Sequence, residues 1–251
     1  MEAPQQNPEK QETKKPITNE SILKFLNEIY KKVNQGAGVI PPIESFANDY
    51  LVKETDPRKA VENMVKVQCT KSAISGILSG FGGFITLPVA LPANITSVII
   101  VQMRMIAATA YMAGYDISSD QVQTLVYACL AGVSIVTIVK KAGIEFGVKL
   151  GKNMVGKIPG RVLIKINQKV GFRFLTKFGT KGIINIGKMI PVVGAVIGGG
   201  FDLVETSVIG NRAIKMFFDG DLNVGTEVTE QEEKQAEDME HEQIEACGTV
   251  K

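Results

Sequence analysis

The sequence predicts an all-α protein, a single helical bundle-like domain with an apolar helical hairpin and disordered polar tails. Apolar residues recur at helical spacing in several segments, among them Ile22, Phe25, Leu26, Ile29 and Val33. Proline, serine, aspartate and glycine stand at the ends of such segments, where helices start and stop. No segment shows the strict apolar and polar alternation of a half-buried strand. These observations favour a bundle of about seven helices.

The composition divides the chain into one body and two tails. Residues 1–20 are polar and contain no aromatic side chain, and we expect them to be disordered. Residues 21–218 form the predicted helical domain, with 23 basic and 11 acidic residues and therefore a net charge of +12. Residues 219–251 hold 11 acidic and two basic residues, a net −9, without a clear apolar face, and are predicted to be a disordered acidic tail; the alternative is a helical turn or two within residues 229–246. A basic body attracts phosphates, and a tethered acidic tail can compete for the same surface.

The first helices are indicated by their capping residues and spacing. Ser21 is a plausible N-cap for an amphipathic helix that runs to Val33. A short segment near residues 45–52 precedes Asp56 and Pro57, an N-cap followed by proline at the first helical position. We expect this next helix to run to about residue 78.

An uncharged run at residues 72–103 is the most apolar feature of the chain. Glycines and prolines in its middle predict two helices joined by an apolar loop rather than one spanning helix. The segment is either a hydrophobic hairpin inside a globule or one that dips into a membrane. The residues expected to insert into a membrane or a partner are Phe81, Phe84, Ile85, Leu87, Pro88, Leu91 and Pro92.

Further helices are expected along the rest of the body. One starts at Pro92 and closes at Gly114. A capping box at residues 118–121 opens an uncharged run that reaches Lys140, which we expect to be one buried core helix. Another should begin after Pro159 and Gly160 and end near Gly179, and the last should run from Pro191 to Phe218.

A regular row of cations is the strongest candidate for a binding surface. Arginine or lysine stands at every fourth position over residues 157–181, backed by bulky apolar residues and with few acidic residues nearby. Within a helix this spacing places the cations in one slowly winding row, which we call the basic stripe. It suits an anionic membrane surface, and the alternative is an ordinary solvated helix face. Its members are Lys157, Arg161, Lys165, Lys169, Arg173, Lys177 and Lys181.

Charged residues inside apolar runs form a second candidate. Arg104 interrupts one run and Asp202 follows another, so we expect a buried polar pair between helices or a polar site in an apolar groove. Gly194 and Gly198 allow close approach of two helices. They lack the strand context and the Lys-Ser/Thr end of a nucleotide-binding loop.

Histidine and cysteine content argues against several chemistries. His241 is the one histidine of the chain and lies in the acidic tail, so a histidine metal site or a Ser-His-Asp triad is not expected. Cys69, Cys129 and Cys247 show no metal-type spacing and are expected to be reduced thiols, which fits a cytosolic face. No cofactor, no metal and no catalytic residue is assigned.

These segments together resemble the EcsC family. The resemblance rests on GFGGFITLPVALPANI, RMIAATAYMAGYD, CLAG, KKAG, KIPGRVLIKINQKVGFRFLTKFG, IPVVGAVIGGGFDL and IGNRAIKMF. It covers about residues 72–217 and implies a helical, membrane-associated protein, without implying a particular reaction. The family name, taken from a locus beside an ABC transporter, suggests such a transporter as a partner. The chain has Ala90 and Val133 at or near positions where the family pattern often has acidic residues, so any role of those carboxylates should be missing here.

We therefore expect a non-enzymatic protein that associates peripherally with the cytoplasmic face of a membrane. Its partners would be anionic lipids and a membrane protein such as an ABC transporter, and nucleic acid is not expected. One alternative is a hydrolase-like enzyme on a lipid-like or peptide substrate, for which Arg104, Asp202 and Glu205 would have to converge. The other is a soluble interaction module whose apolar loop docks a partner helix.

Overall fold

The computed structural model describes residues 17–38, 40–71, 93–144, 151–178 and 200–248, and these are mostly helical. No β-strand occurs in this part of the chain, which confirms the all-α class. The predicted hairpin residues 81–92 and the cation Lys181 lie outside the described residues. The helices are α1 (Asn19–Gln35), α2 (Ile43–Leu51), α3 (Pro57–Lys71), α5 (Ala93–Met112), α6 (Asp120–Ala131), α7 (Val136–Lys141), α8 (Lys152–Val155), α9 (Gly160–Phe178), α11 (Gly200–Phe218) and α12 (Glu230–Gly248).

Several helix ends follow the sequence signals. Pro57 begins α3 as predicted, and Gly114 follows α5 with a positive φ of 79°. Ser119 caps α6 by accepting a hydrogen bond from the backbone N–H of Val122. The cap of α1 is Thr18 rather than the expected Ser21, which instead completes a capping box by accepting from the Thr18 backbone N–H.

The uncharged run after residue 121 is not one helix, contrary to the expectation. Helix α6 ends at Ala131, and Gly132 takes the left-handed conformation with φ 66°. The Gly132 and Val133 amides donate to the carbonyls of Cys129 and Ala128, which satisfies the end of the helix. The next helix, α7, begins at Val136. The glycine therefore stops the helix although its flanks are apolar and favourable to helix.

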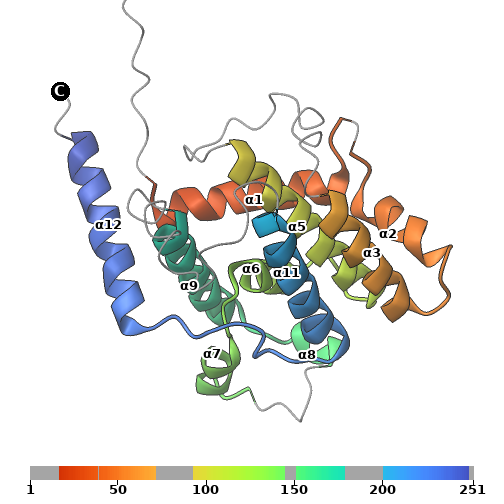
Figure 1. Ribbon diagram of the computed structural model, residues 1–251. Coiled ribbons are helices and arrows are strands. Elements are labelled where there is room, and N and C mark those ends of the chain that lie inside the picture. Colours follow the sequence, from red (N-terminus) through yellow and green to blue (C-terminus); the bar gives the residue numbers. More distant parts are fainter. Residues whose placement is uncertain (1–16, 39, 72–92, 145–150, 179–199, 249–251) are drawn as a thin grey trace, which may run out of the picture.

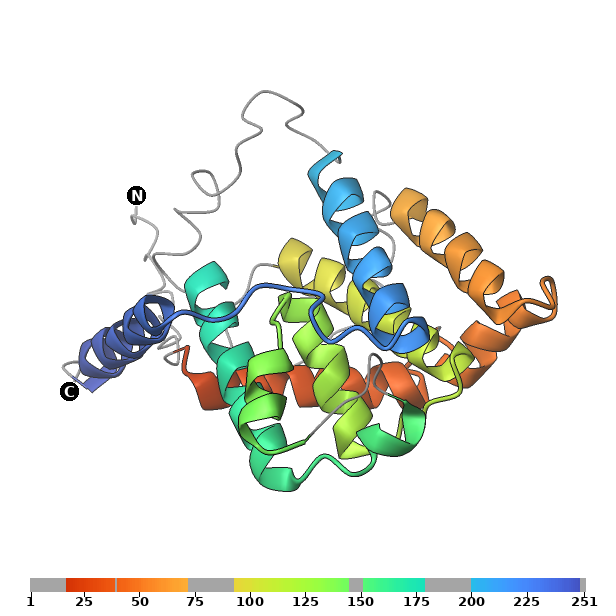
Figure 2. The same ribbon diagram turned by 90° about the horizontal axis from the view of Figure 1, so that it is seen from below.

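Helix α5 lies at the centre of the body and contacts α1, α2, α3, α6 and α11 (Figures 1 and 2). Helix α9 packs on α1, α6 and α7, and α11 packs on α3 as well as on α5. Each fully buried large side chain stabilises this arrangement by about 1.5–3 kcal/mol relative to exposure. The core includes Phe25, Leu26, Ile29, Met103, Ile106, Leu125 and Tyr127.

Most of the acidic segment is helical in the structure, which is the less favoured of the two expectations for it. Residues Glu230–Gly248 form α12, which packs against α9 at the edge of the molecule. Thr229 and Glu232 form a reciprocal capping box at its start, with hydrogen bonds of 3.0 and 3.2 Å between side chain and backbone. Ala236 and Met239 are buried and form its narrow apolar contact. The apolar face of α12 is too narrow to be recognised in the sequence. The helix forms because α9 packs against that face.

Candidate functional site: the basic face of helix α9

Helix α9 presents cations on one side and buries apolar residues on the other. Val162, Ile166, Val170 and Leu175 are almost fully buried, and α9 packs on α1 and α6. This burial fixes the rotation of the helix and so the direction of the basic stripe. Among the described members of the stripe, Lys157, Arg161 and Lys165 are consequently exposed, whereas Lys169, Arg173 and Lys177 are half-buried.

The N-terminal part of the stripe faces solvent. Lys157, Arg161 and Lys165 are exposed and make no ion pair within the described part of the chain. Ile164 lies among them with 69% of its surface exposed. We call these four residues the exposed half of the basic face. Sequence patterns do not single out Ile164, because its exposure depends on how α9 is packed.

The C-terminal part of the stripe is covered by the acidic segment. Lys169 forms an ion pair with Glu233, and the Arg173 guanidinium lies 3.5 Å from a Glu232 carboxylate oxygen. Arg173 also donates to the Thr226 hydroxyl at 3.0 Å and to the Glu227 carbonyl at 3.1 Å. Few acidic residues lie near the stripe in the sequence. In the fold, the acidic residues beside it come from α12. We call Lys169 and Arg173 the covered half.

The position of Lys169 under α12 affects its protonation. Burial lowers the pKa of the Lys169 ammonium, and the like charge of Lys141 at the end of α7 lowers it further. The carboxylate of Glu230 acts in the opposite direction. Positive charges from α7 and α9 thus gather at the place where the acidic helix lies.

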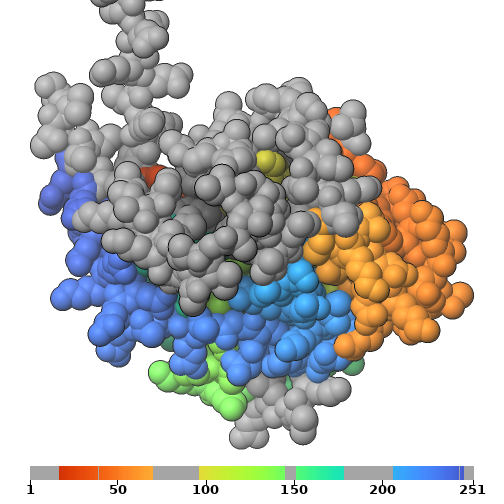
Figure 3. All heavy atoms as spheres, viewed as in Figure 1, coloured from red at the N-terminus to blue at the C-terminus, as the bar shows by residue number. Residues whose placement is uncertain are grey.

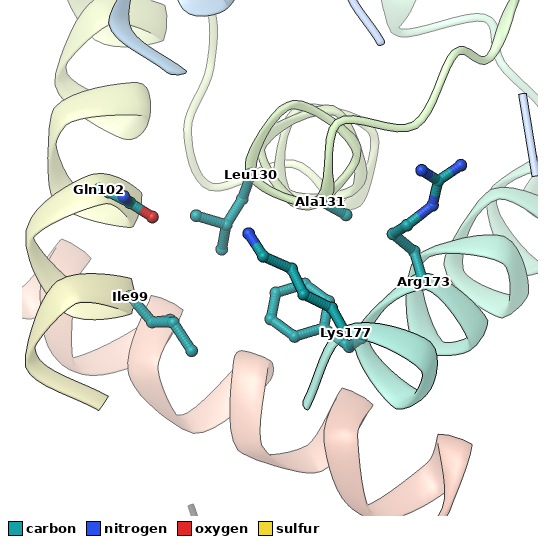
Figure 4. Close-up of a pocket in the computed structure, with 7 residues that line it drawn as sticks. Ile99, Gln102, Leu130, Ala131, Arg173 and Lys177 are labelled. Atoms are coloured by element: carbon teal, nitrogen blue, oxygen red, sulfur yellow. The ribbon is translucent and has the colours of Figure 1, made fainter. Parts of the chain in front are cut away.

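Lys177 lines a small hollow between α5, α6 and α9 (Figure 4). Its amine points into the hollow, whereas the guanidinium of Arg173 is turned away. The space of about 10 Å³ is of the size that one water molecule needs. The hollow therefore has no room for a substrate of drug size. Its lining residues are Ile99, Gln102, Leu130, Ala131, Arg173, Phe174 and Lys177.

The Arg104 side chain contacts the N-terminal part of the chain. Its guanidinium lies 4.0 Å from the centroid of the Phe46 ring and donates to the Pro41 carbonyl at 3.3 Å. Burial lowers the pKa of Arg104. The side chains of Asp202 and Glu205 lie outside those described, so the proposed pair with Asp202 stays a prediction.

The structure adds buried polar groups that sequence patterns did not reveal. Gln102 of α5 donates to the Thr206 hydroxyl of α11 at 3.4 Å, and both side chains are buried. Cys129 is buried in α6, and burial raises its thiol pKa to about 12, which disfavours the nucleophilic thiolate. Within the described residues, no three His, Cys, Asp or Glu side chains lie where they could share a metal ion.

These features define an all-α domain with a basic helical surface and an acidic helix lying on part of it. The chain belongs to the EcsC family, because the model of the EcsC protein family matches residues 52–218, more than half of its length. Neither the curated proteins nor the solved structures gave a match. Helices α1, α2 and α12 lie outside the matched residues. Among the helices that the structure describes, none has the length and apolar character needed to span a bilayer.

Proposed function

We propose that this protein is a non-enzymatic, peripheral membrane protein that binds anionic phospholipids through the exposed half of the basic face. The observation that carries the proposal is the exposure of Lys157, Arg161 and Lys165 around the exposed Ile164. Cations near an anionic membrane surface contribute about 1 kcal/mol each. An isoleucine that leaves water contributes about 1.5–3 kcal/mol when fully buried.

These contributions indicate weak and reversible attachment. Three cations and a partly buried isoleucine together supply roughly 4–5 kcal/mol, which corresponds to a dissociation constant on the order of a millimolar or somewhat below. Lys140 and Lys141 at the end of α7 are also exposed, and α7 packs on α9. The charge of Lys141 acts on Lys169, so these two cations extend the positive field beside the covered half of the basic face. The cytoplasmic leaflet, which is rich in anionic lipid, is the membrane face that such a surface favours.

Cosedimentation with vesicles tests the proposal. The full chain is mixed with vesicles of phosphatidylcholine alone or of phosphatidylcholine with phosphatidylglycerol, at low and at high salt. We expect binding to the anionic vesicles, weakened by salt because exposed charges are screened. Replacing Lys157, Arg161 and Lys165 together by glutamine should reduce this binding by roughly 100-fold.

A matched control removes three exposed cations from elsewhere. Lys53, Lys59 and Lys66 are exposed after α2 and on α3, and their replacement by glutamine changes the net charge equally. We expect this variant to retain most of the binding, because α2 and α3 lie on the side of the body away from α9 (Figure 1). Equal losses in the two variants would mean that total charge rather than the exposed half of α9 attracts the lipid. Wild-type protein that ignores anionic vesicles would overturn the proposal. The ABC transporter partner suggested by the family resemblance remains a separate prediction.

A further inference from the structure

Helix α12 lies on the part of α9 that would otherwise continue the proposed lipid surface. Lys169 and Arg173 follow Lys165 along the same helix at the same four-residue spacing. Without α12, Lys169 would join the three exposed cations, and Arg173 would lose its Glu232 partner while it keeps its hydrogen bonds to Thr226 and Glu227 of the preceding segment. We propose that α12 is a displaceable acidic cover, which competes with anionic lipid for Lys169 and Arg173 and so restrains membrane binding. This inference rests on the proposed function.

The charges of the two helices are complementary. Helix α9 carries five cations and no acid, and α12 carries eight acidic residues and Lys234. Among the described helices, α9 is the one with which α12 makes its main contact. An anionic membrane offers the same chemistry as the acidic face of α12. The two are therefore direct competitors for one surface.

The contact between α12 and α9 is built to be reversible. Its two ion pairs keep some contact with solvent, since Lys169, Glu232 and Glu233 each expose 27% of their side-chain surface and Arg173 exposes 17%. Such pairs contribute little individually and are screened by salt. The apolar contact from α12 consists of Ala236 and Met239. Helix α12 lies along the outer edge of the molecule, with much of its surface open to solvent (Figure 3).

The segment before α12 is anchored more firmly than α12 itself. Figure 2 shows this linker crossing the body from α11 to α12. Leu222 and Val224 are buried, and the Thr226 amide donates to the Gly132 carbonyl at 3.0 Å. The Ser134 amide donates in turn to the Thr226 carbonyl at 2.9 Å. A displaced α12 would therefore stay tethered close to α9, at high effective concentration, and could return.

The position of α12 in the chain supports its role as an added element. The family match covers residues 52–218 and ends before the linker. The acidic helix thus lies outside the matched residues, whereas Lys169 and Arg173 lie within them. The cover and the surface it occupies belong to different parts of the chain.

Charge variants of α12 test the inference. Replacing Glu232 and Glu233 by glutamine removes the partners of Arg173 and Lys169. Replacing Glu237 by glutamine and Asp238 by asparagine removes the same charge from exposed positions of the same helix. At low salt, we expect the contact variant to bind phosphatidylglycerol vesicles roughly three- to tenfold more tightly than wild type. The control variant should change by less than about twofold.

A measurement without lipid separates the cover from the proposed function. Hydrogen exchange of the α12 amides should be faster in the contact variant than in the control variant, while exchange in the buried helix α6 stays the same in both. Equal exchange rates of the α12 amides in the two variants would show that Glu232 and Glu233 do not hold α12 on α9, and the proposed cover would be wrong. If wild type binds anionic vesicles but the contact variant binds no more tightly, competition is wrong while the proposed function stands. If no variant binds, the proposed function fails, and competition for lipid fails with it, whatever the exchange data show.

Discussion

Replacement of Gly225 by alanine tests how the linker before α12 is held. A Cβ atom at Gly225 would overlap the carbonyl group of Gly132 and would lie 2.7 Å from the Val133 nitrogen. These are backbone atoms, so no side-chain rotation can relieve the overlap. Either the linker or the turn after α6 must move. Movement strains or breaks the hydrogen bonds by which Thr226 joins Gly132 and Ser134.

The expected cost follows from these contacts. Each of the two hydrogen bonds contributes about 1 kcal/mol net, and overpacking costs about 1–3 kcal/mol unless the linker leaves its place. If the linker leaves its place, the overlap disappears and only the docking contacts are lost, which limits the total destabilisation. We therefore expect the free energy of unfolding to fall by about 2–3 kcal/mol. Urea denaturation followed by circular dichroism measures this difference.

Gly156 provides the matched control. It has φ −61° and ψ −15°, and a Cβ atom there would meet no heavy atom within 4 Å. Replacing it by alanine should therefore be neutral or stabilise the protein by up to about 1 kcal/mol. If the free energies of unfolding of the Gly225 and Gly156 variants differ by less than about 0.5 kcal/mol, the linker is not docked against the turn after α6.

Two further predictions concern buried groups. In the first, Arg104 is replaced by methionine and Phe46 by leucine, singly and together. Denaturation experiments should give a coupling free energy of about 1 kcal/mol between the two replacements, because the guanidinium lies over the ring. Additive losses of stability would show that the contact contributes nothing. Burial raises the pKa of Cys129 from 9.0 to about 12 and also raises the pKa values of Tyr30 and Tyr127. Because the unfolded chain loses these protons first, the stabilisation is fully present below about pH 9 and is lost as the pH rises toward 12. Urea midpoints that stay level between pH 9 and 11 would contradict this account.

Much of the fold could be read from local patterns. The all-α class, the start of α3 at Pro57 and the end of α5 before Gly114 all follow from spacing and capping residues. The predicted helix after Pro159 agrees closely with α9 (Gly160–Phe178). Such features depend on neighbours within a few residues, which the sequence displays directly. The motifs that resemble the EcsC family were likewise sufficient to identify it.

The acidic helix could not be predicted in the same way. Within residues 219–251, like charges repel and no broad apolar face is visible, so the segment by itself indicates disorder. The partners that order it are Lys169 and Arg173, about 60 positions earlier in the chain. A narrow contact through Ala236 and Met239 suffices once those cations are opposite. The local sequence contains the capping box of Thr229 and Glu232 but says nothing of these partners on α9.

The sequence by itself therefore determined the helical class, the family and the regular spacing of the basic stripe. Only the tertiary structure decided that the stripe is divided, with Lys165 facing solvent and Lys169 paired with Glu233. It also placed Arg104 over Phe46 and left Ile164 exposed among cations. The physical reason is that periodicity defines the face of a helix on which a residue lies. What covers that face depends on contacts between segments distant in the chain, and those arise only on folding.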